Sequence, residues 1–495
     1  METVKTEPPE AVLFLTSRLE VCTLPRVAAG PGRNQLTIKH CKRGNIMTQT
    51  PPIFNCKTPD DVKKAVKEHH IKFIQFWFVD VMGTIKNFQV MPQELEEAFE
   101  EGMGFDGSSI EGFSRIHESD MVAFPDPTTF QLISWRPTEY PVARMFCDIK
   151  TPEGLPYEGD SRYVLKRILN KAAEQGLSYY VGPELEFFLF ANSQEPKTLD
   201  VGGYFDAPPL DLANTIRRDI ILALNNMGIE VEYSHHEVAP SQHEIDLRYQ
   251  EALKMADISV TYRVLVKEIA RKHGVYATFM PKPLFGENGS GMHVHQSLFR
   301  GKTNAFHDPS GEYGLSQMGR AYIAGLLRHA REYTAVTNQW VNSYKRLVPG
   351  YEAPVYIAWA KRNRSALARV PMYKPGKEAA TRVELRSPDP ACNPYLAFAV
   401  TLAAGLKGIE QGYELPAPVE ADIYDMHQEE RLTHGIHNLP GSLYEAIEEM
   451  NSSTMLKEAL GDHIFDKFIE NKRIEWHNYR IQVTDYELNK YLPLL

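Results

Sequence analysis

The chain has 495 residues, 43% of them hydrophobic and 24% charged, which is enough for two or three domains with a large buried core. Its formal net charge is −10, whereas a protein that tracks nucleic-acid phosphates or an acidic membrane needs a basic balance. The longest apolar run, residues 395–406, is shorter than the about 18 to 20 residues that span a bilayer. We therefore expect a globular protein that binds neither nucleic acid nor membrane, and any phosphate binding must be local.

The cysteines are scattered, with neither a paired metal-ligand spacing nor a dense disulfide framework. They are Cys22, Cys41, Cys56, Cys147 and Cys392. This pattern favours buried or incidental thiols in a reducing compartment. We therefore expect a cytoplasmic protein.

The first 46 residues mix acids, bases, proline and glycine with little periodicity, which is typical of a disordered extension. We assign residues 1–54 to this extension. Its arginines suggest a transit peptide as an alternative, but its glutamates weaken that interpretation because transit peptides are poor in acids. Met47 is an alternative start of the protein.

Regular structure is predicted from about residue 58. Thr58, followed by proline and two acids, predicts the start of a helix that ends near residue 70. Alternating apolar residues then predict strands over 71–80 and 85–90. These elements indicate a small, strand-rich N-terminal domain over residues 55–152.

The second domain is predicted over residues 153–495. A helix over 161–175 is followed by strands that carry polar residues, separated by long helices over 249–272 and 317–334. Strands with acids and bases at a period of two cannot form a dry core on both faces. Their polar face must therefore line a wet or metal-filled cavity.

A strand predicted over residues 182–190 places Glu184 and Glu186 on one face and apolar residues on the other. The alternative is a pair of acids that simply face solvent. Flanking aromatic residues indicate burial, however, and adjacent buried carboxylates repel each other unless a cation lies between them. We interpret the pair as metal ligands.

Residues 235–244 follow another predicted strand, 229–233, and add two acids, Glu237 and Glu244. Hard oxygen ligands select Mg²⁺ or Mn²⁺ over the softer metals that cysteine or several histidines would favour. The three histidines of the segment are predicted to support the site rather than to bind the metal.

Residues 286–295 join a glycine-rich turn to a strand on which His293 and His295 share a face. This arrangement suits one metal ligand and one phosphate or nucleotide contact. The glycines alone are a weak signal, because the segment has neither the dinucleotide fingerprint nor the Walker A pattern.

Basic residues concentrate in segments 342–352 and 361–369 of this acidic chain, where a solvated surface is the simpler alternative. A strand predicted over residues 381–386 places Arg382, Glu384 and Arg386 on one face. Guanidinium groups bind carboxylates and phosphoryl oxygens with two parallel hydrogen bonds. Acids for metal together with arginines for substrate indicate a phosphoryl-transfer site.

Segments 282–295 and 349–354, together with Glu184-Leu-Glu186, resemble the signatures of type I glutamine synthetases, and the resemblance runs from about residue 55 to the C-terminus. It implies an α+β fold, with a small N-terminal β-grasp domain followed by a larger α+β catalytic domain whose curved antiparallel sheet lines the active site. It also implies a dodecamer of two stacked hexameric rings, with active sites shared between neighbouring subunits.

The resemblance implies a ligand set for each of two metal ions, Mg²⁺ or Mn²⁺. Glu186, Glu237 and Glu244 would bind the first ion, and Glu184, His293 and Glu384 the second. The other implied site residues are Asp106, which would deprotonate ammonium in a neighbouring subunit's site; Tyr204, Asn288, Gly289, Arg346 and Arg386 for glutamate and ammonium; Glu352 on a flap over the substrate; Arg364 for the transferring phosphoryl group, glutamate and nucleotide; and Glu232, His295, Ser297 and Arg369 for nucleotide.

The implied reaction is ATP-dependent ligation of ammonia to L-glutamate in two steps. The glutamate side chain first attacks the γ-phosphate of ATP to give γ-glutamyl phosphate, and ammonia then displaces phosphate to give L-glutamine. Partners are therefore expected to be glutamate, ammonium, ATP and further copies of the chain.

Two segments bear on the subtype. Residues 112–116 resemble a subtype in which an arginine, here Arg115, couples product binding to feedback inhibition. Tyr424 stands where related enzymes carry an adenylylated tyrosine, but its flanking sequence differs, so control by adenylylation is not expected.

Two other functions are compatible with parts of the sequence. A γ-glutamyl-amine ligase would keep the metal, ATP and glutamate residues but tends to lose the ammonium-site residues, and here Asp106, Tyr204 and Glu352 are all present. A non-catalytic relative would be expected to lose some of the acids and arginines. The full set therefore favours the ammonia ligase.

Overall fold

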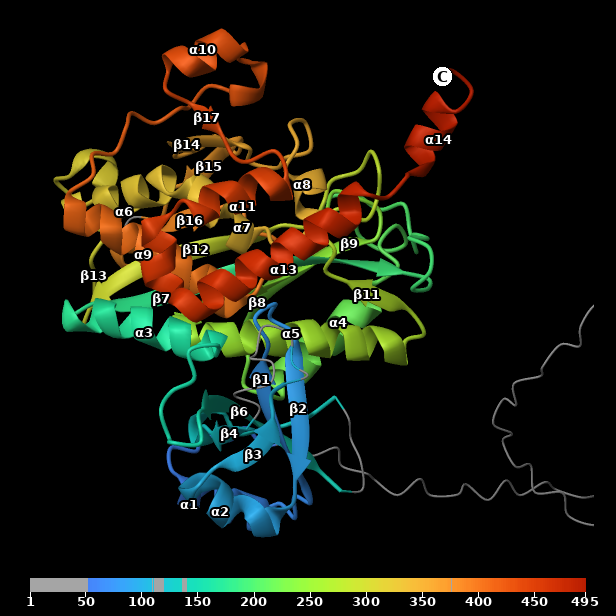
Figure 1. The fold of residues 1–495 in the computed structure, drawn as a ribbon, viewed down its shortest axis with the longest axis vertical. Helices are drawn as coiled ribbons and strands as arrows, with labels where there is room; N and C mark the ends of the chain where they lie inside the picture. The colour runs from blue at the N-terminus through green and yellow to red at the C-terminus, as the bar shows by residue number, and fades with distance from the viewer. Residues whose placement is uncertain (1–51, 109, 111–119, 136–139, 375) are drawn as a thin grey trace, which may run out of the picture. The chain divides into compact units, whose positions relative to one another are not determined.

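The computed structural model describes residues 52–108, 110, 120–135, 140–374 and 376–495 (Figure 1). They form a six-stranded sheet early in the chain and an eleven-stranded sheet later in the chain. None of the described helices combines the length and hydropathy needed to span a bilayer. The predicted α+β organisation, a small strand-rich part followed by a larger one, is confirmed.

The predicted N-terminal extension, residues 1–54, lies almost wholly outside the described residues, as do Met47, Cys22 and Cys41. The other three cysteines are buried and form no disulfide, which agrees with the predicted buried thiols. They are Cys56, Cys147 and Cys392.

The smaller sheet has the strand order β2-β1-β6-β4-β3, with β5 paired to β6. Its central pair, β1 and β6, is parallel, and its other pairs are antiparallel. The elements of this part are α1 (Pro59–Glu68), β1 (Phe73–Val79), β2 (Ile85–Val90), α2 (Leu95–Glu100), β3 (Met103–Asp106), β4 (Asp120–Pro125), β5 (Gln131–Leu132) and β6 (Val142–Lys150).

Helix α1 begins where the sequence predicts. The Thr58 side chain accepts a hydrogen bond from the backbone N–H of Asp61, whose carboxylate accepts one from the Thr58 N–H. This capping box satisfies two backbone donors that the first helical turn leaves without partners. Strands β1 and β2 likewise lie within the ranges predicted for them.

The larger sheet has the strand order β17-β14-β15-β16-β12-β7-β9-β8, with β10 and β11 paired to β7 and β13 paired to β12. Its pairs are antiparallel except for β14 with β15. The elements of this part are α3 (Ser161–Glu174), β7 (Ser178–Phe190), α4 (Asn214–Asn225), β8 (Val231–His236), β9 (Gln242–Leu247), β10 (Gln250–Glu251), α5 (Ala252–Lys272), β11 (Tyr276–Thr278), β12 (Met292–Arg300), β13 (Thr303–Asn304), α6 (Gln317–Arg328), α7 (Ala330–Thr337), α8 (Ser343–Arg346), β14 (Tyr356–Ala360), β15 (Ala366–Arg369), β16 (Val383–Leu385), α9 (Pro394–Gln411), α10 (Gln428–Thr433), β17 (His437–Asn438), α11 (Leu443–Asn451), α12 (Thr454–Leu460), α13 (Asp462–Arg480) and α14 (Asp485–Tyr491).

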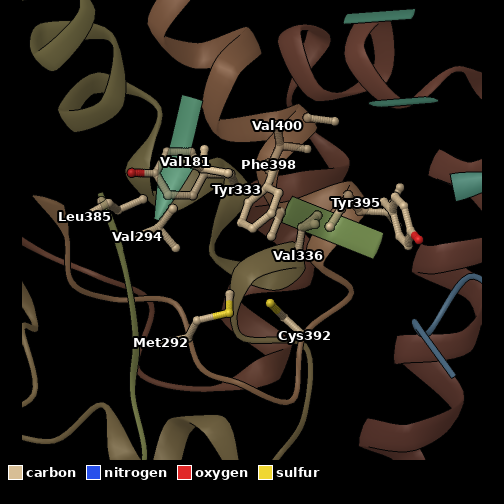
Figure 2. Close-up of a cluster of buried hydrophobic side chains, with 14 of the residues drawn as sticks. Val181, Met292, Val294, Tyr333, Val336, Leu385, Cys392, Tyr395, Phe398 and Val400 are labelled. Carbon is tan, nitrogen blue, oxygen red and sulfur yellow. The ribbon is translucent and has the colours of Figure 1, made fainter. Parts of the chain in front are cut away.

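The apolar face of the central strands packs against helices. Val181 of β7, Val294 of β12 and Leu385 of β16 belong to one buried cluster with Tyr333 of α7 and Phe398 of α9 (Figure 2). Because side chains alternate along a strand, the residues between these positions must face the other way. Burial of this apolar cluster thereby determines which side chains of these strands lie on the polar face of the sheet.

Two predicted helices have different bounds in the structure. The helix predicted over 317–334 is divided at His329, whose backbone (φ −96°, ψ 11°) ends α6 and starts α7, and whose Nδ1 lies 2.8 Å from a carboxylate oxygen of Glu332. The helix predicted from residue 249 begins at Ala252, because Gln250 and Glu251 pair with β7 instead.

Buried charges connect the smaller sheet to the helices of the larger part. Arg162, at the start of α3 and 2% exposed, donates to Asp126 (2.7 Å) and Asp148 (2.5 Å) of the smaller part. The same guanidinium donates to both carboxylate oxygens of Asp257 on α5 (3.1 and 3.2 Å), and the Tyr395 hydroxyl of α9 also donates to that carboxylate (2.6 Å). One arginine therefore contacts three carboxylates from two parts of the chain, and Lys166 shares Asp148 with it.

Replacing this arginine should destabilise the fold. We expect Arg162→Met to lower the free energy of unfolding by about 3–5 kcal/mol, because three acids lose their buried partner. Urea denaturation at one protein concentration measures the loss. The control is Arg473→Met, which removes an exposed pair with Glu448 and should cost at most about 1 kcal/mol. Equal losses in the two variants would contradict the role of the buried network.

Candidate active site

A polar cavity of about 190 Å³ lies on the face of β7, β9, β12 and β16 that is turned away from the apolar cluster. It brings together all six predicted metal ligands and most of the predicted substrate contacts. Its predicted site residues are Glu184, Glu186, Tyr204, Glu237, Glu244, Asn288, Gly289, His293, Arg346, Glu352, Arg364, Arg369, Glu384 and Arg386.

Strand register places the acids side by side. His293 of β12 lies opposite Glu184 of β7, and Glu244 of β9 lies opposite Glu186 of β7. Residues two apart on a strand share a face, so both glutamates of β7 point into the cavity, as the sequence predicts. Antiparallel pairing therefore brings together acids that are about 60 residues apart in the chain.

One group of ligand atoms comes from Glu184, His293 and Glu384, all within 4.8 Å of one another. His293 Nδ1 lies 3.1 Å from Glu184 Oε2 and 3.9 Å from Glu384 Oε1. These are the three residues that the resemblance assigns to the second metal ion.

Arginine contacts favour the ionised form of the acids in this group. Arg386 and Arg369 donate to Glu384 at 2.5 and 2.6 Å. Burial acts to raise the pKa of Glu384, but Arg386 and the two histidines outweigh it and lower the pKa to about 2. Burial likewise opposes ionisation of Glu184, yet His295 and His293 hold its pKa well below the usual range.

The imidazole of His293 is suited to act as a ligand. Burial, followed by the nearby Arg386, lowers its pKa below the ordinary value for histidine. The ring is therefore neutral at neutral pH, and neutral imidazole is the form that binds metal ions.

A second group of ligand atoms, from His235, Glu237 and Glu244, also lies within 4.8 Å. His235 Nε2 is 2.8 Å from Glu237 Oε1 and, despite burial, keeps the pKa of that acid below its usual value. Burial raises the pKa of Glu244 well above its usual value, and the neighbouring acids, Asp246 foremost, raise it further. In this half of the cavity, the positive charge of the protein therefore does not compensate the negative charge that its carboxylates would carry if all were ionised.

Glu186, which the resemblance groups with Glu237 and Glu244, lines the same cavity. Its Oε2 accepts hydrogen bonds from Gln242 Nε2 (2.7 Å) and from the backbone N–H of Gly291 (3.0 Å). Burial and then the charge of Glu237 raise its pKa well above the usual range. The ionised forms of Glu186 and Glu244 are therefore disfavoured unless a cation is bound.

The donor set fits hard divalent cations. The six predicted ligands supply five carboxylates and one neutral imidazole to the cavity, and burial and repulsion disfavour the ionised form of two of these carboxylates. Oxygen-rich sites of this kind favour Mg²⁺ or Mn²⁺ over softer metals. The residues therefore suit the cations that the sequence predicts.

The glycine-rich loop packs closely on Arg346. A Cβ on Gly289 would lie 2.2 Å from the Pro281 carbonyl oxygen, so only glycine fits there. Arg346 is 3% exposed, and its guanidinium donates to the carbonyls of Ser387 (2.7 Å) and Arg386 (3.2 Å). These contacts fix the wall of the cavity predicted to hold glutamate.

The segment that carries Glu352 lines part of the cavity. Tyr351, Glu352 and Ala353 all line it, and Glu352 has φ 54°, in the left-handed region that residues other than glycine rarely adopt. Such strained residues cluster at active sites and ligand clamps. Arg364 enters the cavity from another loop.

A second cavity, of about 310 Å³, adjoins the first. It contains three predicted nucleotide contacts, Glu232, His295 and Ser297, whereas Arg369 lines the first cavity. Glu184 lines both cavities and is 2.7 Å from His295 Nε2.

Two predicted residues do not join the cavities within this chain. Asp106 ends β3 of the smaller part, where its carboxylate accepts from the Ser108 N–H at 2.8 Å, and it lines neither cavity. Arg115 lies outside the described residues. The resemblance assigns Asp106 to a neighbouring subunit's site.

Two residues of β9 belong to the site but were not predicted from the sequence. Gln242 connects Glu186 to the Gly289 carbonyl (3.2 Å). Asp246 is 5% exposed, and neither of its carboxylate oxygens has a hydrogen-bond partner among the described residues. Both share a strand face with Glu244, so the two-residue spacing that identified Glu184 and Glu186 would have found them.

Comparison with known proteins identifies the family of the chain. The family model "Glutamine synthetase, beta-Grasp domain" matches residues 70–152, and "Glutamine synthetase, catalytic domain" matches residues 158–491. Curated glutamine synthetases from Mycolicibacterium smegmatis and Methanosarcina mazei are 55% and 53% identical over 88% and 89% of the chain, and over 98% and 99% of their own lengths.

Solved structures agree as well. A Plasmodium falciparum glutamine synthetase has a TM-score of 0.82 and 25% identity, over 90% of this chain and all of its own. The GmaS/ADP complex has a TM-score of 0.79 and 31% identity, over 87% of this chain and 99% of its own. By its sequence, its two domains and the residues that converge on its larger sheet, the chain belongs to the glutamine synthetase family.

Proposed function

We propose that the protein joins ammonia to L-glutamate at the expense of ATP and releases L-glutamine, ADP and phosphate. The observation that carries this proposal is one cavity that combines six metal-type ligands with Arg364, Arg369 and Arg386. Ligands for hard cations beside guanidinium groups are typical of active sites that transfer phosphoryl groups. The reaction follows from membership of a family whose curated members are glutamine synthetases.

Two or more Mg²⁺ or Mn²⁺ ions are proposed to bind the six ligands, one at Glu186, Glu237 and Glu244 and one at Glu184, His293 and Glu384. Bound cations would neutralise charge on the transferring phosphoryl group. The pKa values support this division, since the second set is already balanced by arginines and the first set is not.

In the first step, an oxygen of the glutamate γ-carboxylate attacks the γ-phosphorus of ATP, and the bond from that phosphorus to ADP breaks. Arg364 is proposed to stabilise the phosphoryl charge, and Arg346 and Arg386 to hold the glutamate. Arg386 is suited to this role because its Nε is buried without a hydrogen-bond partner among the described residues. An anionic ligand would satisfy that N–H.

In the second step, ammonia attacks the acyl carbon and phosphate leaves. A free carboxylate is a poor acyl donor, whereas the acyl phosphate has a good leaving group; the protein supplies position and charge stabilisation. Water would hydrolyse the same intermediate, so the site must exclude it. Glu352, which lines the cavity, is proposed to serve this purpose.

The nucleotide is proposed to occupy the second cavity, with Glu232, His295 and Ser297 as contacts. Glu184 lines both cavities, so the phosphates would reach the metal ligands at their boundary. Arg364 and Arg369 would meet the phosphates from the other side.

The active site is proposed to be shared between subunits of a dodecamer of two hexameric rings. Asp106 lines neither cavity of its own chain, which agrees with a role in a neighbour's site. There it would accept a proton from ammonium, beside Tyr204 and Glu352. We also propose that the product inhibits the enzyme through Arg115 and that the protein is cytoplasmic. Its two domains are proposed to span residues 55–152 and 153–495.

The function is tested by measuring phosphate release with ATP, Mg²⁺ and glutamate while the amine is varied. We expect ammonia to support release and glutamine to form, with polyamines and alkylamines inactive, because Asp106, Tyr204 and Glu352 are retained. Release that requires a polyamine would instead identify a γ-glutamyl-amine ligase, and no release with any amine would identify a non-catalytic relative.

Binding of divalent cation should release protons, because the pKa values of Glu186 and Glu244 are raised in the cation-free protein. A raised carboxyl pKa means that the proton is held at higher pH, so cation affinity should rise with pH up to those pKa values. The expected slope is about tenfold per pH unit for each proton released. Titration calorimetry with Mn²⁺ in buffers of different ionisation enthalpy measures the release, and Glu244→Gln should reduce it. Heats that do not depend on the buffer would contradict the prediction.

Sharing of the site predicts that two inactive variants complement each other. Co-expression of Asp106→Asn with Glu186→Ala should give mixed oligomers in which about one quarter of the sites pair an intact cavity with an intact Asp106. Activity should therefore return to about a quarter of the wild-type value. Mixed oligomers as inactive as their parents would show that Asp106 acts elsewhere.

A further inference from the structure

Residues 350–353, here called the flap, have an unusual backbone conformation. Gly350 has φ 92° and Glu352 has φ 54°. The second value is costly for a residue with a side chain and persists only where the surroundings hold it. The contacts that hold the flap are therefore informative about how Glu352 stays over the cavity.

One side of the flap is held through Tyr351. The ammonium of Lys282 lies 3.8 Å from the centre of the Tyr351 ring, a close cation–π contact. Lys282 is itself fixed, because its backbone N–H donates to the Asn342 side chain (2.7 Å) and its carbonyl accepts from that side chain (3.0 Å). Its ammonium also donates to the Glu287 carbonyl, beside the glycine-rich loop.

The other side of the flap is held through Ala353. The Tyr424 hydroxyl donates to the Ala353 carbonyl at 2.7 Å. Burial raises the pKa of Tyr424 to about 12, so the hydroxyl keeps its proton at neutral pH. The Tyr424 hydroxyl is thus engaged with the flap.

The segment around Tyr424 also holds the loop that carries Arg364. The backbone N–H of Ile423 donates to Ser365 Oγ at 3.2 Å, and the Asn363 side chain donates to the Ala421 carbonyl at 2.5 Å. The flap and the phosphoryl-binding arginine are therefore positioned from one segment.

We infer that Lys282 and Tyr424 are positioning residues that hold the two ends of the flap, so that Glu352 covers the acyl phosphate while it awaits ammonia. This inference rests on the proposed function. When the flap opens, a water oxygen bonds to the acyl carbon, the bond from that carbon to the phosphate oxygen breaks, and the water protons pass to solvent and to phosphate. Glutamate is regenerated, and the net reaction is hydrolysis of ATP to ADP and phosphate.

The measurement is the ratio of phosphate released to glutamine formed, together with glutamate-dependent phosphate release without ammonia. We expect Tyr424→Phe and Lys282→Met to raise both quantities by about 2- to 10-fold, the range expected from losing one hydrogen bond or cation–π contact. Lys282→Arg keeps a cation over the ring and should restore the wild-type ratio.

Matched controls separate positioning from general destabilisation. Lys150→Met removes a cation 3.7 Å from the Phe124 ring in the smaller part, and Tyr444→Phe removes an exposed hydroxyl of α11. Both should keep the wild-type ratio. A variant of Lys282 or Tyr424 that loses phosphate and glutamine in equal proportion would overturn the inference, whereas a wild-type enzyme that forms no glutamine would overturn the proposed function itself.

Discussion

Repulsion between like charges is the constraint on which the rest of this structure depends. The alternation of β7, β9 and β12 brings Glu184, Glu186 and Glu244 onto one face of the larger sheet. Carboxylates so close together oppose folding unless protons or cations neutralise them. The apolar cluster on the opposite face, with Val294 and Phe398 among its members, supplies burial that keeps the strands in this register.

The cavity meets this constraint in two ways. The negative charge of Glu384 is compensated within the protein by Arg369 and Arg386, so this group is ionised without a bound cation. Burial and the neighbouring acids raise the pKa values of Glu186 and Glu244 well above the usual range, so these two groups favour a proton or a cation. Arginine that belongs to the chain is always present, whereas a divalent cation or a proton can leave. The half of the cavity that contains Glu384 is thus permanently charged, whereas the charge of the half that contains Glu186 and Glu244 depends on whether protons or cations are bound.

Period-two alternation is a local property, so the sequence alone could predict that Glu184 and Glu186 share a face and that acids and arginines make a phosphoryl-transfer site. The same rule, applied to β9, would have found Gln242 and Asp246, which were not predicted. The division of the helix at His329, where the side chain contacts Glu332, is not revealed by helical periodicity. Which strands pair, and hence that Glu244 faces Glu186, depends on contacts between distant segments and came into the sequence analysis only through the resemblance.

Glu184 belongs to both cavities, and this has a consequence for how the two ligands influence each other. Its carboxylate faces His293 on one side and His295 on the other. A ligand that changes the charge or orientation of this group in one cavity changes it in the other, so the two binding free energies cannot be independent. Nucleotide and cation are thermodynamically coupled through a single side chain, and substitutions in the two cavities will be non-additive wherever both depend on it.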